Sequence, residues 1–167
     1  AAFDRRPLAI ARATGAADII AAVTFARESR ISLAVRGGGH SVAGYSTTEG
    51  GLLLDLGPMK GVHVDPTARR VRAQAGLTWG ELDRETQAFG LATTGGRVTS
   101  TGIAGFILGS GSGWLERLHG LACDNLLSAA VVTANGRLLN VSASENTDSG
   151  RAMALRATSC MRLTKDW

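Results

Sequence analysis

The sequence predicts a single domain that mixes helices and strands, with a parallel βαβ unit at its start and a β-hairpin near its end. The βαβ unit is indicated by strand-like segments at 7–13 and 31–36 and by apolar residues at helical spacing between them, up to about Arg30. The hairpin is indicated by the turn Asn135–Gly136 between the strand-like flanks of 126–143. A length of 167 residues suits one domain.

Between these units the sequence predicts three more strands and a clearly marked helix. The strand-like runs occupy 52–56, 61–65 and 70–76, and the last of them alternates apolar with polar residues. The helix spans 78–90, because Thr78 and Glu81 form a capping box and Gly90 stands where a helix ends. We expect a shorter helix at 114–120.

Glycine is the compositional anomaly of the chain. The 22 glycines are accompanied by only 3 prolines, and they cluster at 37–39, 50–51, 95–96 and 102–113. Clusters without a repeat suggest backbone that must pass close to something. The segment 93–113 also holds apolar residues, which predicts a partly buried loop that wraps a ligand rather than a linker.

Charge and cysteine usage argue against several functional classes. The net charge of +4 comes from scattered arginines without a basic block, so we expect no nucleic-acid partner, whereas a phosphorylated small molecule would suit the surplus. No apolar run reaches the ~18 residues of a membrane-spanning helix. Cys123 and Cys160 have neither disulfide-framework nor metal-site spacing. No signal peptide is evident, which favours the cytoplasm over secretion, although a chain that begins at Ala1 could have lost a leader.

The motif RGGGHS, Arg36–Ser41, places three glycines directly after a predicted strand. It is not a P-loop, and it misses the dinucleotide fingerprint because Val42 occupies the third glycine position, although Asp55 lies at about the usual distance. Successive amides without side chains can form a concavity that binds anions. A second loop around Thr101–Gly105 could add amides from the opposite side, which suits a pyrophosphate. Glycine counts alone leave open the alternative of two tight turns.

His40 is the only one of the three histidines beside a predicted ligand loop. Neutral imidazole is a nucleophile and a general base near neutral pH, so a covalent or proton-relay role is one hypothesis and a structural role is the other. His63 lies mid-strand and His119 in an amphipathic stretch, and we expect both to be structural.

Three ordered segments carry a resemblance to a known family. They are DRRPLAIARATGAADI, RGGGHS and TTGGRVTSTGIAGFILGSGSGWLERLHGLACDNLLSAAVVTANG. Together, over residues 3–148, they resemble the FAD-binding (PCMH-type) domain of the vanillyl-alcohol oxidase/p-cresol methylhydroxylase superfamily, and most of all bacterial berberine-bridge-enzyme-like oxidoreductases. The resemblance implies an α+β fold of two packed subdomains, a small βαβ-containing one and a larger mixed sheet with helices, with FAD between them.

The resemblance also implies a set of cofactor contacts. The pyrophosphate loop would be Arg36, Gly37, Gly38, Gly39, His40 and Ser41. His40 matches the histidine that bonds covalently to the flavin 8α carbon, a link that retains the cofactor and makes it a stronger oxidant. The remaining contacts would be Thr101, Gly102 and Gly105 in a second loop, Gly111, Gly113, Gly120, Leu121, Asp124 and Asn125 under the cofactor, and Val132, whose backbone would meet the adenine.

Three positions depart from the family pattern or need separate interpretation. Some relatives carry a second, cysteinyl flavin link at the position of Val98, so we expect one link here. Cys123 lies elsewhere and is interpreted as a small buried thiol. Ser110 stands where glycine is usual, and it could strain that turn.

The end of the chain departs most from the family. We predict an FAD-binding domain at 1–148, short at its N-terminus, and a divergent tail at 149–167 in place of an aromatic, glycine-rich segment and a substrate domain. The family's catalytic base lies in that missing part, so no catalytic residue is assigned. We therefore expect the FAD domain of an oxidase or dehydrogenase that moves hydride from a substrate C–H bond to flavin N5, incomplete and inactive as this chain alone.

Two other functions are weighed against this one. A non-catalytic remnant with weak or no flavin binding would leave apolar surface exposed. A nucleotide-sugar reductase with the same flavin fold ranks low, because such enzymes generally lack a histidine at the His40 position. The full-length relative would take a small-molecule substrate, and the sequence leaves its identity, the electron acceptor and the oligomeric state open.

Overall fold

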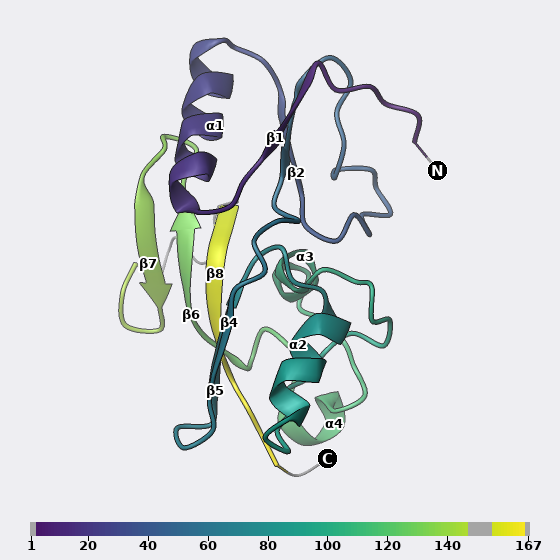
Figure 1. Cartoon of the computed structure of the whole chain (residues 1–167), viewed down its shortest axis with the longest axis vertical. Helices are drawn as coiled ribbons and strands as arrows, with labels where there is room; N and C mark the ends of the chain where they lie inside the picture. The colour runs from purple at the N-terminus through teal and green to yellow at the C-terminus, as the bar shows by residue number, and fades with distance from the viewer. Residues whose placement is uncertain (1–2, 147–154, 166–167) are drawn as a thin grey trace.

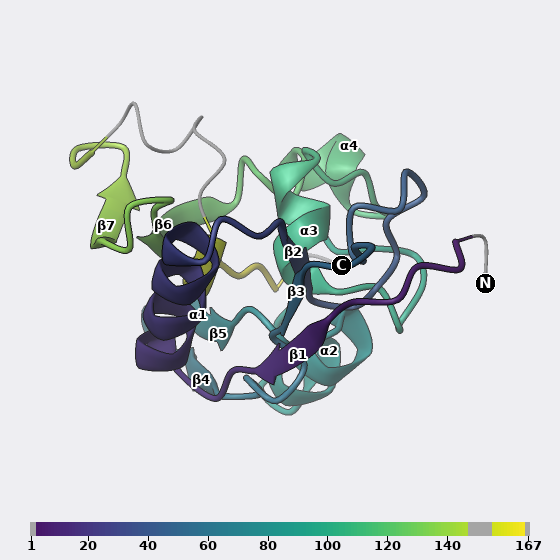
Figure 2. The same ribbon diagram turned by 90° about the horizontal axis from the view of Figure 1, so that it is seen from above.

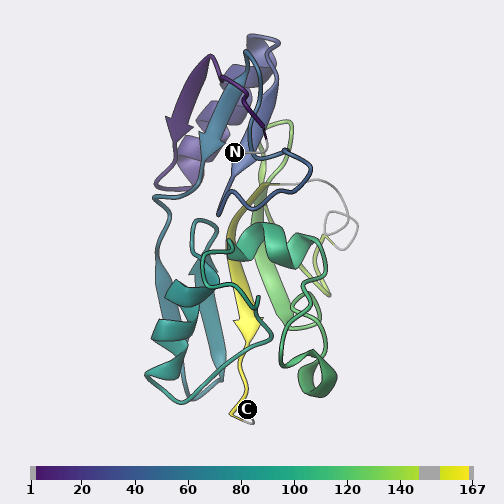
Figure 3. The same ribbon diagram turned by 90° about the vertical axis from the view of Figure 1, so that its right-hand side faces the viewer.

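The computed structural model describes residues 3–146 and 155–165, which form two sheets with four helices. The smaller sheet has three strands and lies beside helix α1, whereas the larger sheet has five strands with α2, α3 and α4 along one side (Figure 1). Seen from the side, the small sheet with its helix lies above the large one, and α3 lies near the junction (Figure 3). The predicted α+β class with two subdomains is confirmed.

The small sheet is a parallel βαβ unit with a third strand inserted. Its elements are β1 (Ala9–Arg12), α1 (Ala16–Glu28), β2 (Leu33–Arg36) and β3 (Leu52–Asp55). The strand order is β1-β3-β2 and both pairings are parallel, so β3 separates the two strands of the βαβ unit. Ile19 and Val23 of α1 are buried in one apolar cluster with Leu52 and Leu54 of β3. The N-cap residue of the helix is Gly15.

The large sheet contains the hairpin and the end of the described chain. Its strands are β4 (Val62–Asp65), β5 (Arg70–Gln74), β6 (Leu126–Val132), β7 (Leu138–Ser142) and β8 (Leu155–Arg162). The strand order is β4-β5-β8-β6-β7, and the four pairings between these strands are all antiparallel. We expected the larger sheet to mix parallel and antiparallel pairs, but in the described residues the parallel pairs belong to the small sheet. β8, for which no element was predicted, lies in the centre of the sheet (Figure 1).

Three helices cover one face of the large sheet: α2 (Trp79–Gln87), α3 (Ile103–Leu108) and α4 (Glu116–His119). The predicted capping box is present at α2, where Glu81 Oε2 accepts from the Thr78 amide at 2.8 Å. Trp79, Leu82, Ile103 and Ile107 are buried with Val71 of β5 and Met161 of β8 in a second apolar cluster. The α3 helix lies inside the segment that we predicted to be a loop.

The hairpin turn joins the two sheets at one side. Gly136 has φ +81°, but Asn135 does not have a positive φ, and the Thr133 amide donates to the Arg137 carbonyl at 2.9 Å, so the hairpin closes through a three-residue loop, 134–136, rather than the predicted two-residue turn. Arg27 of α1 donates to the Asn135 carbonyl at 2.8 Å. The view from above shows α1 beside β6 (Figure 2). The described ranges contain no helix with the length and apolar character that a membrane crossing needs.

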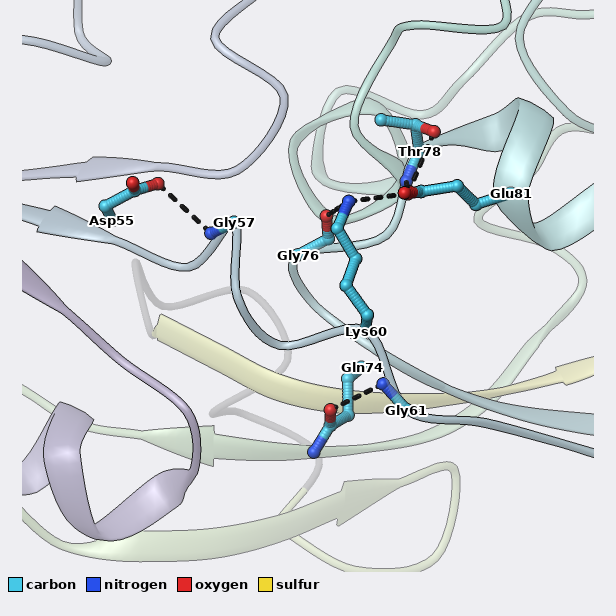
Figure 4. A network of polar contacts seen from close by, with 8 residues as sticks. All are labelled: Asp55, Gly57, Lys60, Gly61, Gln74, Gly76, Thr78 and Glu81. Carbon is cyan, nitrogen blue, oxygen red and sulfur yellow. Dashed lines mark hydrogen bonds and ion pairs between the residues drawn. The ribbon is translucent and has the colours of Figure 1, made fainter.

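A polar network joins the connection between the sheets to the start of α2 (Figure 4). Lys60 Nζ donates to the Gly76 carbonyl at 2.7 Å and to Glu81 Oε2 at 2.6 Å. Gly76 lies so close to the Leu56 carbonyl that a Cβ atom would be 1.9 Å from that oxygen. Residues 56–60, which follow β3, and residues 75–78, which lie between β5 and α2, are therefore in direct contact where the two sheets meet.

Candidate functional site

The two glycine loops predicted from the sequence meet in the structure. A Cβ atom on Gly38 would lie 2.2 Å from the Gly102 nitrogen and 3.2 Å from the Ser100 carbonyl oxygen. Gly37 also lies close to the β5 end, because its Cβ would be 3.4 Å from the Ala75 carbonyl. The loop after β2 and the loop before α3 therefore touch through their backbones, which only residues without side chains permit.

The amides of the first loop are available to a ligand. Among the residues that the structure describes, no backbone N–H from Gly37 to Ser41 donates to a protein acceptor. Gly39 has φ +74°, a conformation that suits glycine and turns the chain toward His40. Buried or partly buried amides normally have partners, so a run of free amides beside a second loop fits an anion.

His40 faces the second loop from the end of the first. Its Nε2 atom lies 3.0 Å from Ser100 Oγ, and both side chains are exposed. His63 and His119 do not share this place, because His63 is exposed on β4 and His119 ends α4. Ser100 was not singled out by the sequence, since no local motif relates it to a histidine 60 residues away.

An arginine–aspartate cluster lies at the carboxyl ends of the parallel strands. Arg36, in register with Asp55, donates to its Oδ2 at 3.2 Å, and Arg12 Nε lies 3.9 Å from the same oxygen. Burial raises the pKa of Asp55, but hydrogen bonds from Arg36 and from the Gly57 amide, together with the charges of both arginines, outweigh it, so that pKa lies below its usual value. Arg36, the residue directly before the glycine loop, is thus held by an ion pair with Asp55.

The second loop is supported from below by Trp79, which sequence reasoning did not identify. The ring is fully buried against Gly95 and Gly96, at whose positions a Cβ would lie 2.7 and 2.8 Å from ring atoms. Phe106 of α3 contacts it edge to face, with ring centroids 5.2 Å apart. The Trp79 amide donates to the Thr101 carbonyl at 3.0 Å. The loop therefore rests on a rigid aromatic pair.

The segment from 109 to 125, also predicted to lie under a cofactor, is held by its own side chains. Asn125 is buried and donates to the carbonyls of His119 and Leu121 at 2.9 and 3.0 Å, while Asp124 accepts from the Leu121 amide at 2.8 Å. Gly113 touches the chain upstream of the second loop, because its Cβ would lie 1.9 Å from the Gly95 carbonyl oxygen. Asp124 and Asn125 therefore shape this segment.

Two further predicted contacts differ in how open they are. Gly105 is exposed on α3, and a Cβ there would meet nothing within 4 Å, so space is left beside the second loop. Val132 is fully buried at the end of β6, between β7 and β8, in the apolar cluster that includes α1. Contact between its backbone and an adenine stays a prediction, as do the other individual cofactor contacts.

Comparison with known proteins decides the family. A model of the FAD binding domain family matches residues 7–142, most of the chain. The chain belongs to this family. FAD is thus the cofactor of the family, and the predicted resemblance is confirmed.

Named relatives of this FAD-binding domain are flavoenzymes. It is 39% identical over 141 residues to (R)-6-hydroxynicotine oxidase of Paenarthrobacter nicotinovorans, covering 84% of this chain and 31% of the oxidase. It is also 39% identical over 140 residues to an FAD-linked oxidoreductase of Dictyostelium discoideum, covering 84% of this chain and 30% of that protein. The chain thus spans about a third of the length of these relatives.

Solved structures share the fold over almost the whole chain. The FAD-binding domain superimposes on 6-hydroxy-D-nicotine oxidase from Arthrobacter nicotinovorans with a TM-score of 0.92 and 34% identity, covering 96% of this chain and 37% of the other. The TM-score is 0.89, with 30% identity, for glucooligosaccharide oxidase from Acremonium strictum, covering 98% and 36%. That oxidase has a 6-S-cysteinyl, 8α-N1-histidyl FAD.

Proposed function

We propose that this FAD-binding domain closes Gly37–Ser41 and Thr101–Gly105 from two sides on the FAD pyrophosphate, as part of an oxidoreductase acting on a small molecule. The observation that carries the proposal is the contact of Gly38 with Gly102 beside a run of amides without protein partners. Open space at Gly105 also fits a ligand there. When bound, FAD supplies the hydride acceptor for a substrate C–H bond, at N5 of its isoalloxazine ring.

The remaining predicted contacts belong to this proposal in two ways. Gly111, Gly113 and Gly120 would bring backbone under the cofactor, with Leu121 beside them. Asp124 and Asn125 would act by holding that segment in shape, because their polar atoms are engaged with its backbone. The three glycines are themselves tightly packed, because a Cβ would lie 2.6 Å from Phe106 at Gly111, 1.9 Å from the Gly95 carbonyl oxygen at Gly113 and 2.8 Å from Asp124 at Gly120.

We also propose that His40 attaches the flavin covalently through the 8α carbon. His40 lies in the loop Gly37–Ser41, whose amides have no protein acceptor in the described part of the chain, and this place supports the proposal. The histidyl FAD of the Acremonium oxidase also supports it. Val98, exposed at the position of the cysteinyl link in some relatives, cannot form a thioether, so we propose a single link. One bond suffices to retain the cofactor.

Turnover is proposed to need more protein than this chain. The relatives named above are about three times as long as this chain. Isolated chain should bind FAD and show no oxidase turnover.

The test is acid precipitation of the purified chain after incubation with FAD. We expect flavin absorbance and in-gel fluorescence in the pellet of the unmodified chain, flavin in the supernatant for His40→Ala, and an unchanged pellet for the matched control His63→Ala. Fully extractable flavin in the unmodified chain would remove the covalent link. A dialysis measurement of reversible FAD binding then decides whether the loop proposal survives.

The alternative of a remnant that binds little flavin has an observation in its favour. Large apolar side chains near the loops are exposed, including Val42 at 93%, Tyr45 at 79% and Trp114 at 78%. Such surfaces favour self-association over ligand binding. A colourless, aggregated preparation that takes up no FAD would establish this alternative and end the proposal above.

A further inference from the structure

A hydrogen bond connects the side chain of His40 to Ser100, which lies just before the second glycine loop. It joins Nε2 of the imidazole to the serine Oγ across 3.0 Å and a separation of 60 residues. In the described part of the chain, the other ring nitrogen, Nδ1, has no protein partner. The two ring nitrogens are therefore in different environments, and this difference bears on which of them can react.

Ser100 is held firmly enough to orient a ring. The Thr101 amide donates to the Val98 carbonyl at 3.1 Å, which closes a turn around Ser100. The amides of Gly80 and Trp79, in the first turn of α2, donate to the carbonyls of Thr99 and Thr101 at 2.9 and 3.0 Å. Both neighbours of Ser100 are thus tied to a capped helix, so the backbone that carries its hydroxyl is held by bonds that do not involve the histidine.

Neutral imidazole carries one N–H and one lone pair. If Nε2 carries the proton and donates it to Ser100 Oγ, the lone pair is on Nδ1, the nitrogen without a partner in the described part of the chain. If the serine donates instead, Nδ1 is protonated and neither nitrogen is a free nucleophile. We infer that Ser100 is a positioning residue that accepts the Nε2–H of His40 and so presents Nδ1 for bonding to FAD, an inference that rests on the proposed covalent attachment.

The bonding step balances with dioxygen as the oxidant. A bond forms between Nδ1 and the carbon of the flavin 8-methyl group, one C–H bond of that methyl group breaks, and its hydrogen leaves as a proton. The imidazole gives up its Nε2 proton toward Ser100 and water. The electron pair of the broken bond reduces the ring system by two electrons, and dioxygen takes up these electrons with two protons to form hydrogen peroxide.

The first experiment follows covalent incorporation of added FAD over time by in-gel flavin fluorescence. Ser100→Ala should slow incorporation roughly tenfold, because one orienting hydrogen bond is lost, while Ser100→Thr keeps the hydroxyl and should restore most of the rate. Ser144→Ala, which removes a hydroxyl contact at the end of β7, should leave the rate unchanged. Unchanged incorporation in Ser100→Ala would overturn the inference.

The second experiment reads the imidazole directly, without any flavin. The chain has three histidines, so ¹⁵N-histidine labelling with His40→Ala for assignment identifies the His40 nitrogens by NMR. We expect a protonated Nε2 and a lone-pair Nδ1 in the unmodified protein at alkaline pH, with the Nε2 proton exchanging faster with water in Ser100→Ala. A protonated Nδ1, or equal exchange in the two proteins, would refute the inference.

The two experiments separate this inference from the proposed covalent attachment. If the unmodified chain incorporates no covalent flavin while His40 shows the expected protonation and its protection by Ser100, the covalent proposal fails and the orientation of His40 by Ser100 holds. If incorporation depends on His40 but not on Ser100, the covalent proposal holds and the positioning role fails. Each result therefore assigns the failure to one of the two statements.

Discussion

Gly38 and Gly102 approach each other so closely that neither position can accept a methyl group. A Cβ atom on Gly102 would lie 2.3 Å from the Gly38 nitrogen and 2.9 Å from its Cα, and one on Gly38 would lie 2.7 Å from the Gly102 Cα. The clash in both directions is with backbone, which cannot rotate out of the way as a flexible side chain can. The contact therefore sets the distance between the two loops proposed to hold FAD.

Gly38→Ala and Gly102→Ala should each separate the loops. We expect the free energy of unfolding to fall by about 2 kcal/mol, because the backbone must move to admit the methyl group. FAD affinity should fall at least tenfold, roughly 1.4 kcal/mol, when measured by titration in the His40→Ala background, where flavin binds reversibly.

The matched control is Gly15→Ala at the start of α1, where a Cβ would meet nothing within 4 Å. It should change stability by less than about 1 kcal/mol and leave FAD affinity unaltered. Equal affinity in the Gly38→Ala and parent proteins would show that the loops do not need this contact to bind the cofactor.

Gly105→Ala should separate ligand binding from folding. The position is exposed in α3 and open around the Cβ, so alanine should keep or raise stability by up to about 1 kcal/mol through its higher helix propensity. If FAD occupies that space, affinity should nonetheless fall, by roughly tenfold in the same titration. Thermal unfolding without FAD provides the control, and unchanged affinity would remove Gly105 from the proposed site.

The sequence predicted most elements but not their pairing. The capping box of α2 and the hairpin at Asn135–Gly136 depend on neighbouring residues, and both are present, although the hairpin loop has three residues rather than two. The insertion of β3 between β1 and β2 depends on pairing between distant segments, which local patterns do not specify. The α3 helix was missed because its six residues include Gly105 and follow Gly102, and glycine is a poor helix former.

The central strand β8 was missed for a different physical reason. Buried and more exposed positions alternate from Ala157 to Arg162, but Ser159 occupies a buried position and Cys160 a more exposed one, so the apolar–polar pattern of the sequence is interrupted in the middle of the strand. Residues 155–162 were assigned to a divergent tail outside the FAD-binding domain, yet they pair with β5 and β6. The domain boundary at 148 stays a prediction.

The candidate site shows the same division between local and distant signals. The glycine loops were visible because unusual composition marks a backbone that must approach something. Trp79 and Ser100 were not, because each acts through a partner far along the chain, Trp79 on Gly95 and Ser100 on His40. Many helices begin with a capping box and many loops contain a serine, so the local sequence around Trp79 and Ser100 is not unusual. Only their contacts with Gly95 and His40 in the folded chain mark these two residues.

Asp55 should make stability depend on pH at the acid end. Its pKa in the folded state is below the ordinary value of 3.8, so the stability gained from its charge is present above pH 3.8 and is lost as the pH falls through the lower folded value. Asp55→Asn should reduce the unfolding free energy at neutral pH by about 1–3 kcal/mol, because Arg36 loses a charged partner. Urea denaturation at several pH values measures both effects.

Arg36→Met provides the companion variant for this prediction. It removes the main partner of Asp55, so it should also flatten the pH dependence of stability below pH 3.8. The double variant should be less destabilised than the sum of the two single ones by about 1 kcal/mol, the expected coupling of a direct contact. Parallel pH curves for the parent and Asp55→Asn proteins would contradict the assigned role of the ion pair.

Ser110→Gly should stabilise the protein. The expectation that serine could strain this turn agrees with the structure, where Ser110 has φ +75°, followed by Gly111 at +80°. A left-handed conformation costs a non-glycine residue about 1–2 kcal/mol, and the greater flexibility of glycine in the unfolded chain offsets part of the gain. We therefore expect the free energy of unfolding to rise by about 0.5–1 kcal/mol.

Ser112→Gly is the matched control: Ser112 has no positive φ and its hydroxyl accepts a hydrogen bond from Arg97 at 3.4 Å, so glycine there should lower stability. Chemical denaturation of both variants decides the matter, and equal losses at the two positions would mean that the turn stores no strain.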